Sequence, residues 1–184
     1  MKPMFSLAFI SAAAATALLG ACTTMTPSSM KMVDNAALPE PVRVPAGQTM
    51  KMSTVGTGEL TYECRDKKDM AGQYEWVLLG PVANLYGPDK AMVGKYYAGP
   101  TWESTDGSKV TGKQVAVAPG GAGNIPLQLV KADPAMGMGK MQGVSYIQRL
   151  NTKGGVAPAS TCDMASKGMK QQVAYQADYV FYGM

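Results

Sequence analysis

The chain has 184 residues, which is enough for one ordinary domain and an additional N-terminal segment. Its hydrophobic fraction is 46%, and its formal net charge of +4 is small and scattered, so a nucleic acid is not an expected partner. Histidine is absent, which excludes Ser-His-Asp and Cys-His nucleophile systems and zinc sites built from histidines.

The first 21 residues have the features of a secretory signal peptide. Lys2 supplies a positive charge, residues 5–19 are apolar, and two small residues follow. The apolar run is shorter than the roughly 20 residues that a membrane-spanning helix needs. Leu-Gly-Ala-Cys at residues 19–22 resembles a bacterial lipobox, in which the signal is cut before the cysteine and the thiol is lipidated. We therefore predict lipidation of Cys22, with an ordinary cleaved secretory signal as the alternative.

The residues after Cys22 indicate where the lipid holds the protein. Several acyl chains on one cysteine bind a protein stably to a bilayer. Thr23 stands where an aspartate would direct retention, and by resemblance to sorting in enteric bacteria this predicts the outer membrane, with the domain in the periplasm or at the cell surface. Residues 22–45 are rich in Thr, Ser, Pro and Asn, which predicts a flexible tether before a single domain over residues 46–184.

Short segments of alternating polarity, separated by turn residues, run through the domain. They predict strands at residues 48–55, 60–64, 74–79, 95–98, 101–104, 109–117, 125–131, 144–150 and 173–182. Gly56-Thr57-Gly58 is expected to turn the first strand into the second, and Asp106-Gly107 to close a hairpin. No window has a helical stripe. The sequence therefore predicts an all-β domain, an antiparallel sandwich or barrel of about seven to nine short strands.

Two cysteines remain after lipidation of Cys22, namely Cys64 and Cys162. In an oxidising periplasm an even pair predicts one disulfide bond. Two free buried thiols are the alternative. A redox site is not favoured, because no Cys-x-x-Cys pattern is present.

Motifs follow one another in order from about residue 38 to residue 182. They are Tyr62-x-Cys64, Trp76, the block at residues 98–103, the turn at 106–108, Ile125-Pro126, the run at 146–158, Cys162 and the closing segment 175–182. Together they resemble DUF3455, a domain-of-unknown-function family whose members are mostly secreted. The resemblance implies no biochemical role. The chain departs from the pattern at Tyr96, where a histidine is expected, and at Leu127, where a tryptophan is expected; any role of that histidine in catalysis or metal binding is therefore lost here.

Aromatic and charged residues on both sides of the turn at 106–107 predict a binding site. Tyr96 and Trp102 could stack on sugar rings, although aromatic residues in strands more often belong to the core. Arg149 and Lys153 flank a segment that could hold an anion in a backbone nest, although such a segment is more often a tight turn. With the carboxylate of Glu103 they form the candidate site, and an envelope glycan or protein is the candidate partner.

Other chemistry is less well supported. Met136, Met138 and Met141 lie in one loop, and thioethers suit Cu(I), but a flexible loop in a chain with 15 methionines is the simpler interpretation. The glycine-rich segments do not complete a dinucleotide fingerprint, and no cofactor is expected. Glu103 and Asp106 are a weak candidate pair for sugar hydrolysis, since Asp106 is more simply a turn residue.

The sequence thus favours a lipid-anchored envelope protein whose β domain is a non-catalytic binding or structural module. The commonest general base is missing, and the remaining carboxylates stand in turn-like contexts. A glycan-acting enzyme and a Cu(I)-binding protein are the alternatives.

Overall fold

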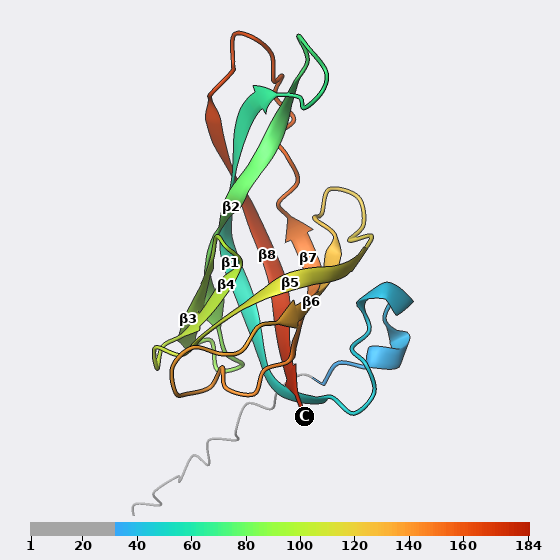
Figure 1. Cartoon of the computed structure of the whole chain (residues 1–184), viewed down its shortest axis with the longest axis vertical. Helices are drawn as coiled ribbons and strands as arrows, with labels where there is room; N and C mark the ends of the chain where they lie inside the picture. Colours follow the sequence, from blue (N-terminus) through green and yellow to red (C-terminus); the bar gives the residue numbers. More distant parts are fainter. Residues whose placement is uncertain (1–31) are drawn as a thin grey trace, which may run out of the picture.

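The computed structural model describes residues 32–184, so the predicted signal peptide, Cys22 and the first part of the predicted tether lie outside the described residues. Eight antiparallel strands in this range form one sheet that closes into a barrel (Figure 1). The strands are β1 Thr49–Asp66, β2 Tyr74–Tyr86, β3 Met92–Tyr97, β4 Thr101–Ser104, β5 Lys109–Ala118, β6 Leu127–Ala132, β7 Tyr146–Gly154 and β8 Lys170–Gly183. Each strand pairs with the next, and β8 closes the barrel on β1. The predicted all-β class is confirmed, and the arrangement is the barrel.

The predicted turn at Gly56-Thr57-Gly58 is wrong, because β1 continues through it as one strand. A Cβ atom on Gly56 would lie 2.5 Å from the Tyr179 ring, and one on Gly58 would lie 2.1 Å from the carbonyl oxygen of Val82. No side chain fits at such distances. Because glycine has no side chain, the Tyr179 ring can lie against β1 at Gly56, and the β2 backbone can do so at Gly58. Close approach of a neighbouring group is a second common reason for glycine in a strand.

Aromatic side chains fill the interior of the barrel. Tyr96 of β3 stacks on Trp102 of β4 with 4.7 Å between ring centroids, and Tyr179 of β8 packs against both rings at 5.0 and 5.9 Å. Leu85 and Phe181 belong to the same buried cluster. Side chains of alternate residues in each strand point inwards, and an eight-stranded barrel is just wide enough for them to fill.

The N-terminal segment covers one outer face of the barrel. It contains two 3-10 turns, η1 Asn35–Ala37 and η2 Glu40–Val42, and the second lies against β5 and β6. Val42 and Val44 are buried in a second apolar cluster that includes Leu129, Leu150 and Val180. Residues 32–45, which the sequence assigns to the tether, are thus packed on the domain.

A buried glutamine fastens this segment. Gln148 of β7 is fully buried, and its amide donates hydrogen bonds to the Val42 carbonyl at 2.6 Å and to Asn35 Oδ1 at 3.1 Å. Its side-chain oxygen accepts a hydrogen bond from the Tyr182 hydroxyl at 2.9 Å. The buried amide thus donates two hydrogen bonds and accepts one, so neither its nitrogen nor its oxygen is left unpaired.

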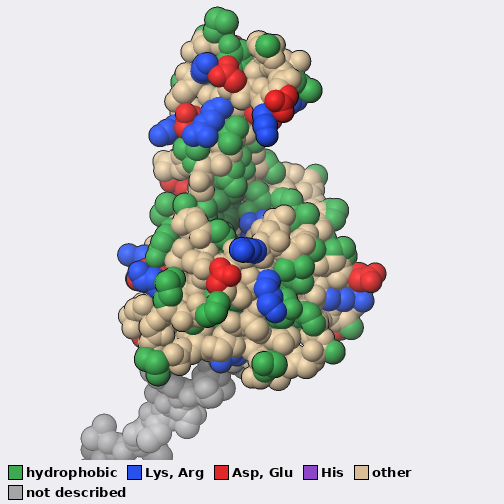
Figure 2. Space-filling model, in the orientation of Figure 1, with side chains coloured by type: hydrophobic (Ala, Val, Ile, Leu, Met, Phe, Trp, Pro, Cys, Tyr) green, Lys and Arg blue, Asp and Glu red, His purple; other side chains and the backbone are tan. Residues whose placement is uncertain are grey.

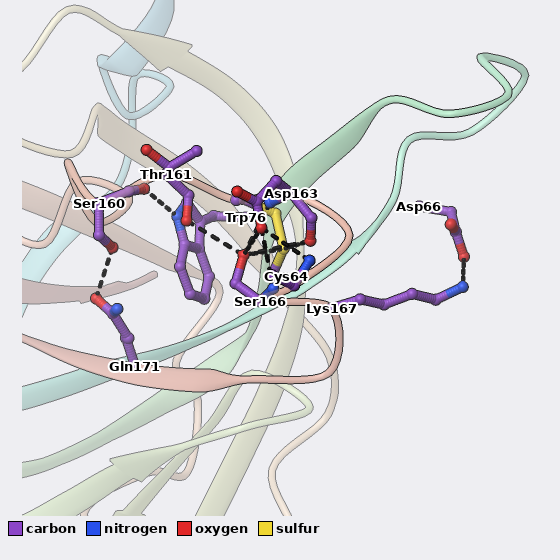
Figure 3. Close-up of a disulfide and its surroundings, with 11 residues drawn as sticks. Cys64, Asp66, Trp76, Ser160, Thr161, Asp163, Ser166, Lys167 and Gln171 are labelled. Atoms are coloured by element: carbon purple, nitrogen blue, oxygen red, sulfur yellow. Dashed lines mark hydrogen bonds and ion pairs between the residues drawn. A yellow bond between two sulfur atoms is a disulfide. The ribbon is translucent and has the colours of Figure 1, made fainter.

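The ends of β1, β2 and β8 extend beyond the barrel as a projection. The space-filling view shows it as a lobe joined to the barrel by a narrower waist (Figure 2). The predicted disulfide is confirmed there: Cys64 in β1 is bonded to Cys162 in the loop before β8, across 98 residues of sequence. Trp76 lies beside it and donates from Nε1 to the Ser160 carbonyl at 2.8 Å (Figure 3). No helix among residues 32–184 is long and apolar enough to cross a membrane.

Replacing Gln148 by leucine should destabilise the fold by about 3 kcal/mol. The change leaves the Val42 carbonyl and the Tyr182 hydroxyl without their buried partner, and each such loss costs about 1–3 kcal/mol. Urea unfolding measures the free energy, and limited proteolysis reports whether residues 32–45 have detached. Gln172→Leu, on the exposed face of β8, is the matched control and should change stability by less than about 0.5 kcal/mol. Equal stability of the two variants would contradict the fastening role of Gln148.

Candidate functional site

Tyr96 and Trp102, the two predicted aromatic site residues, lie inside the barrel. They are only 6% and 1% exposed, respectively. They therefore form no exposed stacking face for a glycan, because their rings are engaged with one another and with Tyr179. Their burial matches the simpler interpretation, in which aromatic residues in strands belong to the core.

Arg149 points toward the same interior. It stands opposite Tyr179 in the β7–β8 pairing, and directly paired residues lie on the same face of a sheet. Its side chain is half-buried, and Nε and Nη2 both donate to the Pro126 carbonyl, at 3.1 and 2.9 Å. No carboxylate forms a salt bridge with Arg149 within residues 32–184. A cation is thus held beside the aromatic core without an anionic partner in the described part of the chain.

Four tyrosines surround this position. Burial raises the pKa values of Tyr62, Tyr96, Tyr175 and Tyr179, and the positive charge of Arg149 opposes the rise at each of them. The Tyr62 hydroxyl donates to the Gly155 carbonyl at 2.7 Å, and the Tyr175 and Tyr179 hydroxyls are 3.2 Å apart. We call Arg149 and these four tyrosines the upper mouth of the barrel.

The surface is hollowed where the projection joins the barrel, and hydrophobic side chains cover the walls of the hollow (Figure 2). In the same orientation β7 ends beside this region and β8 passes through it (Figure 1). A second feature of the interior is the indole nitrogen of Trp102. It is buried, and no acceptor within the described range is placed to receive its hydrogen. The interior therefore contains a donor and a cation that the described protein atoms leave incompletely paired.

Glu103 and Lys153 lie outside the barrel. Glu103 stands opposite Lys95 and Lys109, and its carboxylate accepts a hydrogen bond from the Tyr97 hydroxyl at 2.7 Å and pairs with Lys109 at 3.2 Å. The hydrogen bond from Tyr97 and the contact with Lys109 lower the pKa of Glu103.

Lys153 is exposed and stands opposite Gln176. Gln176 lies between the buried Tyr175 and Ala177 of β8, so Gln176 and Lys153 face outwards. The predicted site is therefore divided. Tyr96, Trp102 and Arg149 share the interior, whereas Glu103 and Lys153 face solvent on the other side of the sheet.

Asp106 is the turn residue that the sequence predicts. Its carboxylate accepts hydrogen bonds from the hydroxyl and the backbone N–H of Ser108, at 2.6 and 2.9 Å, and from the backbone N–H of Lys140 at 2.8 Å. These bonds, the Ser108 hydroxyl above all, hold the pKa of Asp106 well below its usual range. Asp106 thus ties the β4–β5 turn to the loop that follows β6.

The three methionines of that loop do not share one environment. Met141 is 1% exposed and belongs to the barrel core, whereas Met138 is 79% exposed and Met136 is also at the surface. Binding of one Cu(I) ion by all three would require Met141 to leave the core. Within residues 32–184, no group of three or more Cys, Asp or Glu side chains is placed to hold a metal ion.

The opposite end of the barrel has a cavity of about 540 Å3 that sequence reasoning missed. We call it the lower cavity; the start of β1, the β2–β3 turn and the loop after β6 line it. Its residues are Lys51, Met52, Ser53, Thr54, Gly87, Pro88, Asp89, Val93 and Lys140. No motif in the sequence indicated it, because the three segments are far apart in the chain and meet only when the barrel closes.

A family model described as a protein of unknown function (DUF3455) matches residues 45–183 of this chain. The match covers all eight strands and both cysteines of the disulfide. No curated protein and no solved structure matches the chain.

The tyrosines predict a loss of stability in alkali. Their pKa values in the folded state are raised above the ordinary value of about 10, so above that pH the unfolded chain binds fewer protons than the fold. The stability contribution is complete below about pH 10 and falls as the pH rises, by up to about 1.4 kcal/mol per pH unit for each tyrosine. Urea unfolding between about pH 8 and 11, with phenolate absorbance, measures this. Tyr62→Phe should reduce the slope, and a free energy of unfolding that stays constant over this range would disprove the expectation.

Proposed function

We propose, from the premise that the chain belongs to the DUF3455 family, that it is a non-catalytic binding module of the cell envelope. Lipid on Cys22 anchors it to the outer membrane, and its domain lies in the periplasm or at the cell surface. The upper mouth of the barrel binds a small organic anion with an apolar body. The observation that carries this proposal is the half-buried Arg149 without a carboxylate partner among residues 32–184.

The chemistry of the upper mouth favours an anion. The guanidinium of Arg149 carries five N–H donors, and only those on Nε and Nη2 reach the Pro126 carbonyl. A charged, half-buried donor is most stable when an anion shares its hydrogen bonds. Carboxylate, sulfonate and phosphate groups match the planar guanidinium in shape as well as in charge.

The surroundings of Arg149 favour an apolar body on the same ligand. Tyr62 and Tyr175 lie near enough to the cation for its charge to lower their pKa values, and an aromatic lining with a few polar groups that orient the ligand is usual for a small-molecule site.

The same groups favour binding over catalysis. The ionisable residues of the upper mouth are one arginine and four tyrosines whose pKa values are raised, so at neutral pH the phenols remain protonated. They donate hydrogen bonds and do not act as general bases there. The two carboxylates that the sequence singles out, Glu103 and Asp106, are engaged in an outer ion pair and in a turn.

Mass spectrometry of the membrane fraction tests the anchor. The mature N-terminus should be Cys22, with acyl chains on its thiol and amino group, because the lipobox directs both cleavage and lipidation. Cys22→Ser should move the protein out of the detergent-extracted fraction. A mature chain that starts elsewhere and carries no acyl group would refute the anchor without bearing on the barrel.

Fluorescent probe binding tests the upper mouth. Anilinonaphthalene sulfonate combines an anion with an aromatic body, and phenylnaphthylamine is a neutral counterpart. Arg149→Gln should weaken binding of the sulfonate at least about tenfold, since a hydrogen bond to a charged group contributes about 1.5–3 kcal/mol, and should leave the neutral probe unaffected.

Two controls separate the upper mouth from other cations. Arg65→Gln, on the exposed projection, removes the same charge elsewhere. Lys51→Gln with Lys140→Gln removes the cations of the lower cavity. Sulfonate binding that is the same in wild type and Arg149→Gln, or that is lost in the lysine variant instead, would remove the upper mouth as the site.

A further inference from the structure

The lower cavity has cations at its rim and apolar side chains at its floor. Lys51 and Lys140 are exposed, whereas Met52 and Val93 pack against the barrel core. The Lys51 ammonium donates one hydrogen bond, to the Gln142 carbonyl at 2.8 Å, and an ammonium has three donors. The nearby Asp89 carboxylate is used within its own turn, where it accepts from the Ala91 N–H at 3.1 Å. Donors for an external anion therefore remain at the rim.

Three exposed methionines stand on segments that line the cavity. Met92 follows the β2–β3 turn, and Met136 and Met138 lie in the loop that carries Lys140; all three are exposed. Flexible apolar side chains interspersed with lysines are typical of protein surfaces that lie in the interfacial region of a bilayer. Two of the three segments that line the cavity thus also expose apolar side chains.

The same end of the barrel is tied to the proposed anchor. Met32, the first described residue, lines a surface cavity with Gln48, Thr49 and Met50, directly before Lys51. Cys22 precedes Met32 by ten residues, which span at most about 35 Å when extended. With lipid on Cys22, the lower end of the barrel must remain within that distance of the bilayer. This step rests on the anchor proposed above.

We propose that the lower cavity binds the phosphate group of an anionic membrane lipid, so that this end of the barrel rests on the bilayer. The phosphate oxygens accept hydrogen bonds from Lys51 and Lys140, and the glycerol and upper acyl carbons contact Met52 and Val93. Charge complementarity selects anionic over zwitterionic lipids, since the rim carries two lysines and the only carboxylate of the lining is Asp89.

Vesicle binding of the chain from residue 22 onward, with Cys22→Ser to exclude acylation, tests the site. This chain contains every described residue. It should sediment with vesicles of phosphatidylcholine and phosphatidylglycerol, and much less with phosphatidylcholine alone. Lys51→Gln with Lys140→Gln should weaken binding about 25-fold, since each lysine near an anionic surface contributes about fivefold. Lys140→Gln alone should weaken it about fivefold and removes no hydrogen bond within the described chain.

The matched control is Lys68→Gln with Lys113→Gln, which makes the same change in net charge at exposed positions away from the cavity. It should leave binding within about twofold of wild type. An equal loss in this control would assign binding to diffuse charge and overturn the site. Equal binding to phosphatidylcholine vesicles would overturn headgroup selection. Binding of inorganic phosphate without binding of vesicles would assign the cavity to a soluble anion. The assay uses no acylated protein, so failure of the anchor and failure of the cavity are distinguished.

Discussion

The barrel depends on three aromatic rings, two from the β3–β4 hairpin and one from the distant β8. Tyr96, Trp102 and Tyr179 pack within 4.7–5.9 Å of one another and fill the space that the closed sheet encloses. Their size imposes a condition on β1, which passes beside the Tyr179 ring and can do so only because position 56 is a glycine. A methyl group there would push the ring out of the stack or β1 out of the sheet. The close contact between Gly56 and Tyr179 therefore permits both the unbroken course of β1 and the closure of the barrel.

The outer face of the barrel is organised by a polar contact instead. Gln148 reaches the N-terminal segment through two donated hydrogen bonds and accepts one from Tyr182. The apolar cluster around Val42 would tolerate small shifts of the segment, because hydrophobic contacts are not directional. A buried amide does not tolerate them, since each shift leaves a polar group unpaired. The glutamine therefore specifies where the segment lies, and Val42 and Val44 bury apolar side chains beneath it.

Much of the fold could be predicted from local patterns. Alternation of polarity predicted the strand class, Asp106-Gly107 predicted the β4–β5 turn, and the cysteine pair predicted the disulfide. These features depend on neighbouring residues or on redox compartment. The errors arose where distant segments meet. Gly56 and Gly58 have the sequence of a turn, and only their contacts with Tyr179 and β2 explain their place in a strand.

The candidate site was predictable only in part for the same reason. Tyr96, Trp102 and Arg149 do share the barrel interior, but the alternation that reveals a strand does not state which of its faces is inside. Glu103 is adjacent to Trp102 in sequence and therefore on the opposite face. The lower cavity forms only when closure of the barrel brings three distant segments together. No residue spacing within any one of these segments predicted a cavity.

The two ends of the barrel differ because the aromatic core lies between them. At the lower end the cations are lysines, whose compact ammonium groups suit a hydrated phosphate. At the upper end the cation is a planar guanidinium beside aromatic rings, and one wall rises into the projection. That wall lies beyond the barrel and has little core of its own, so the Cys64–Cys162 bond and the Trp76 hydrogen bond hold it in place (Figure 3). The disulfide thus joins two segments of the projection, which adjoins the hollow at the side of the barrel.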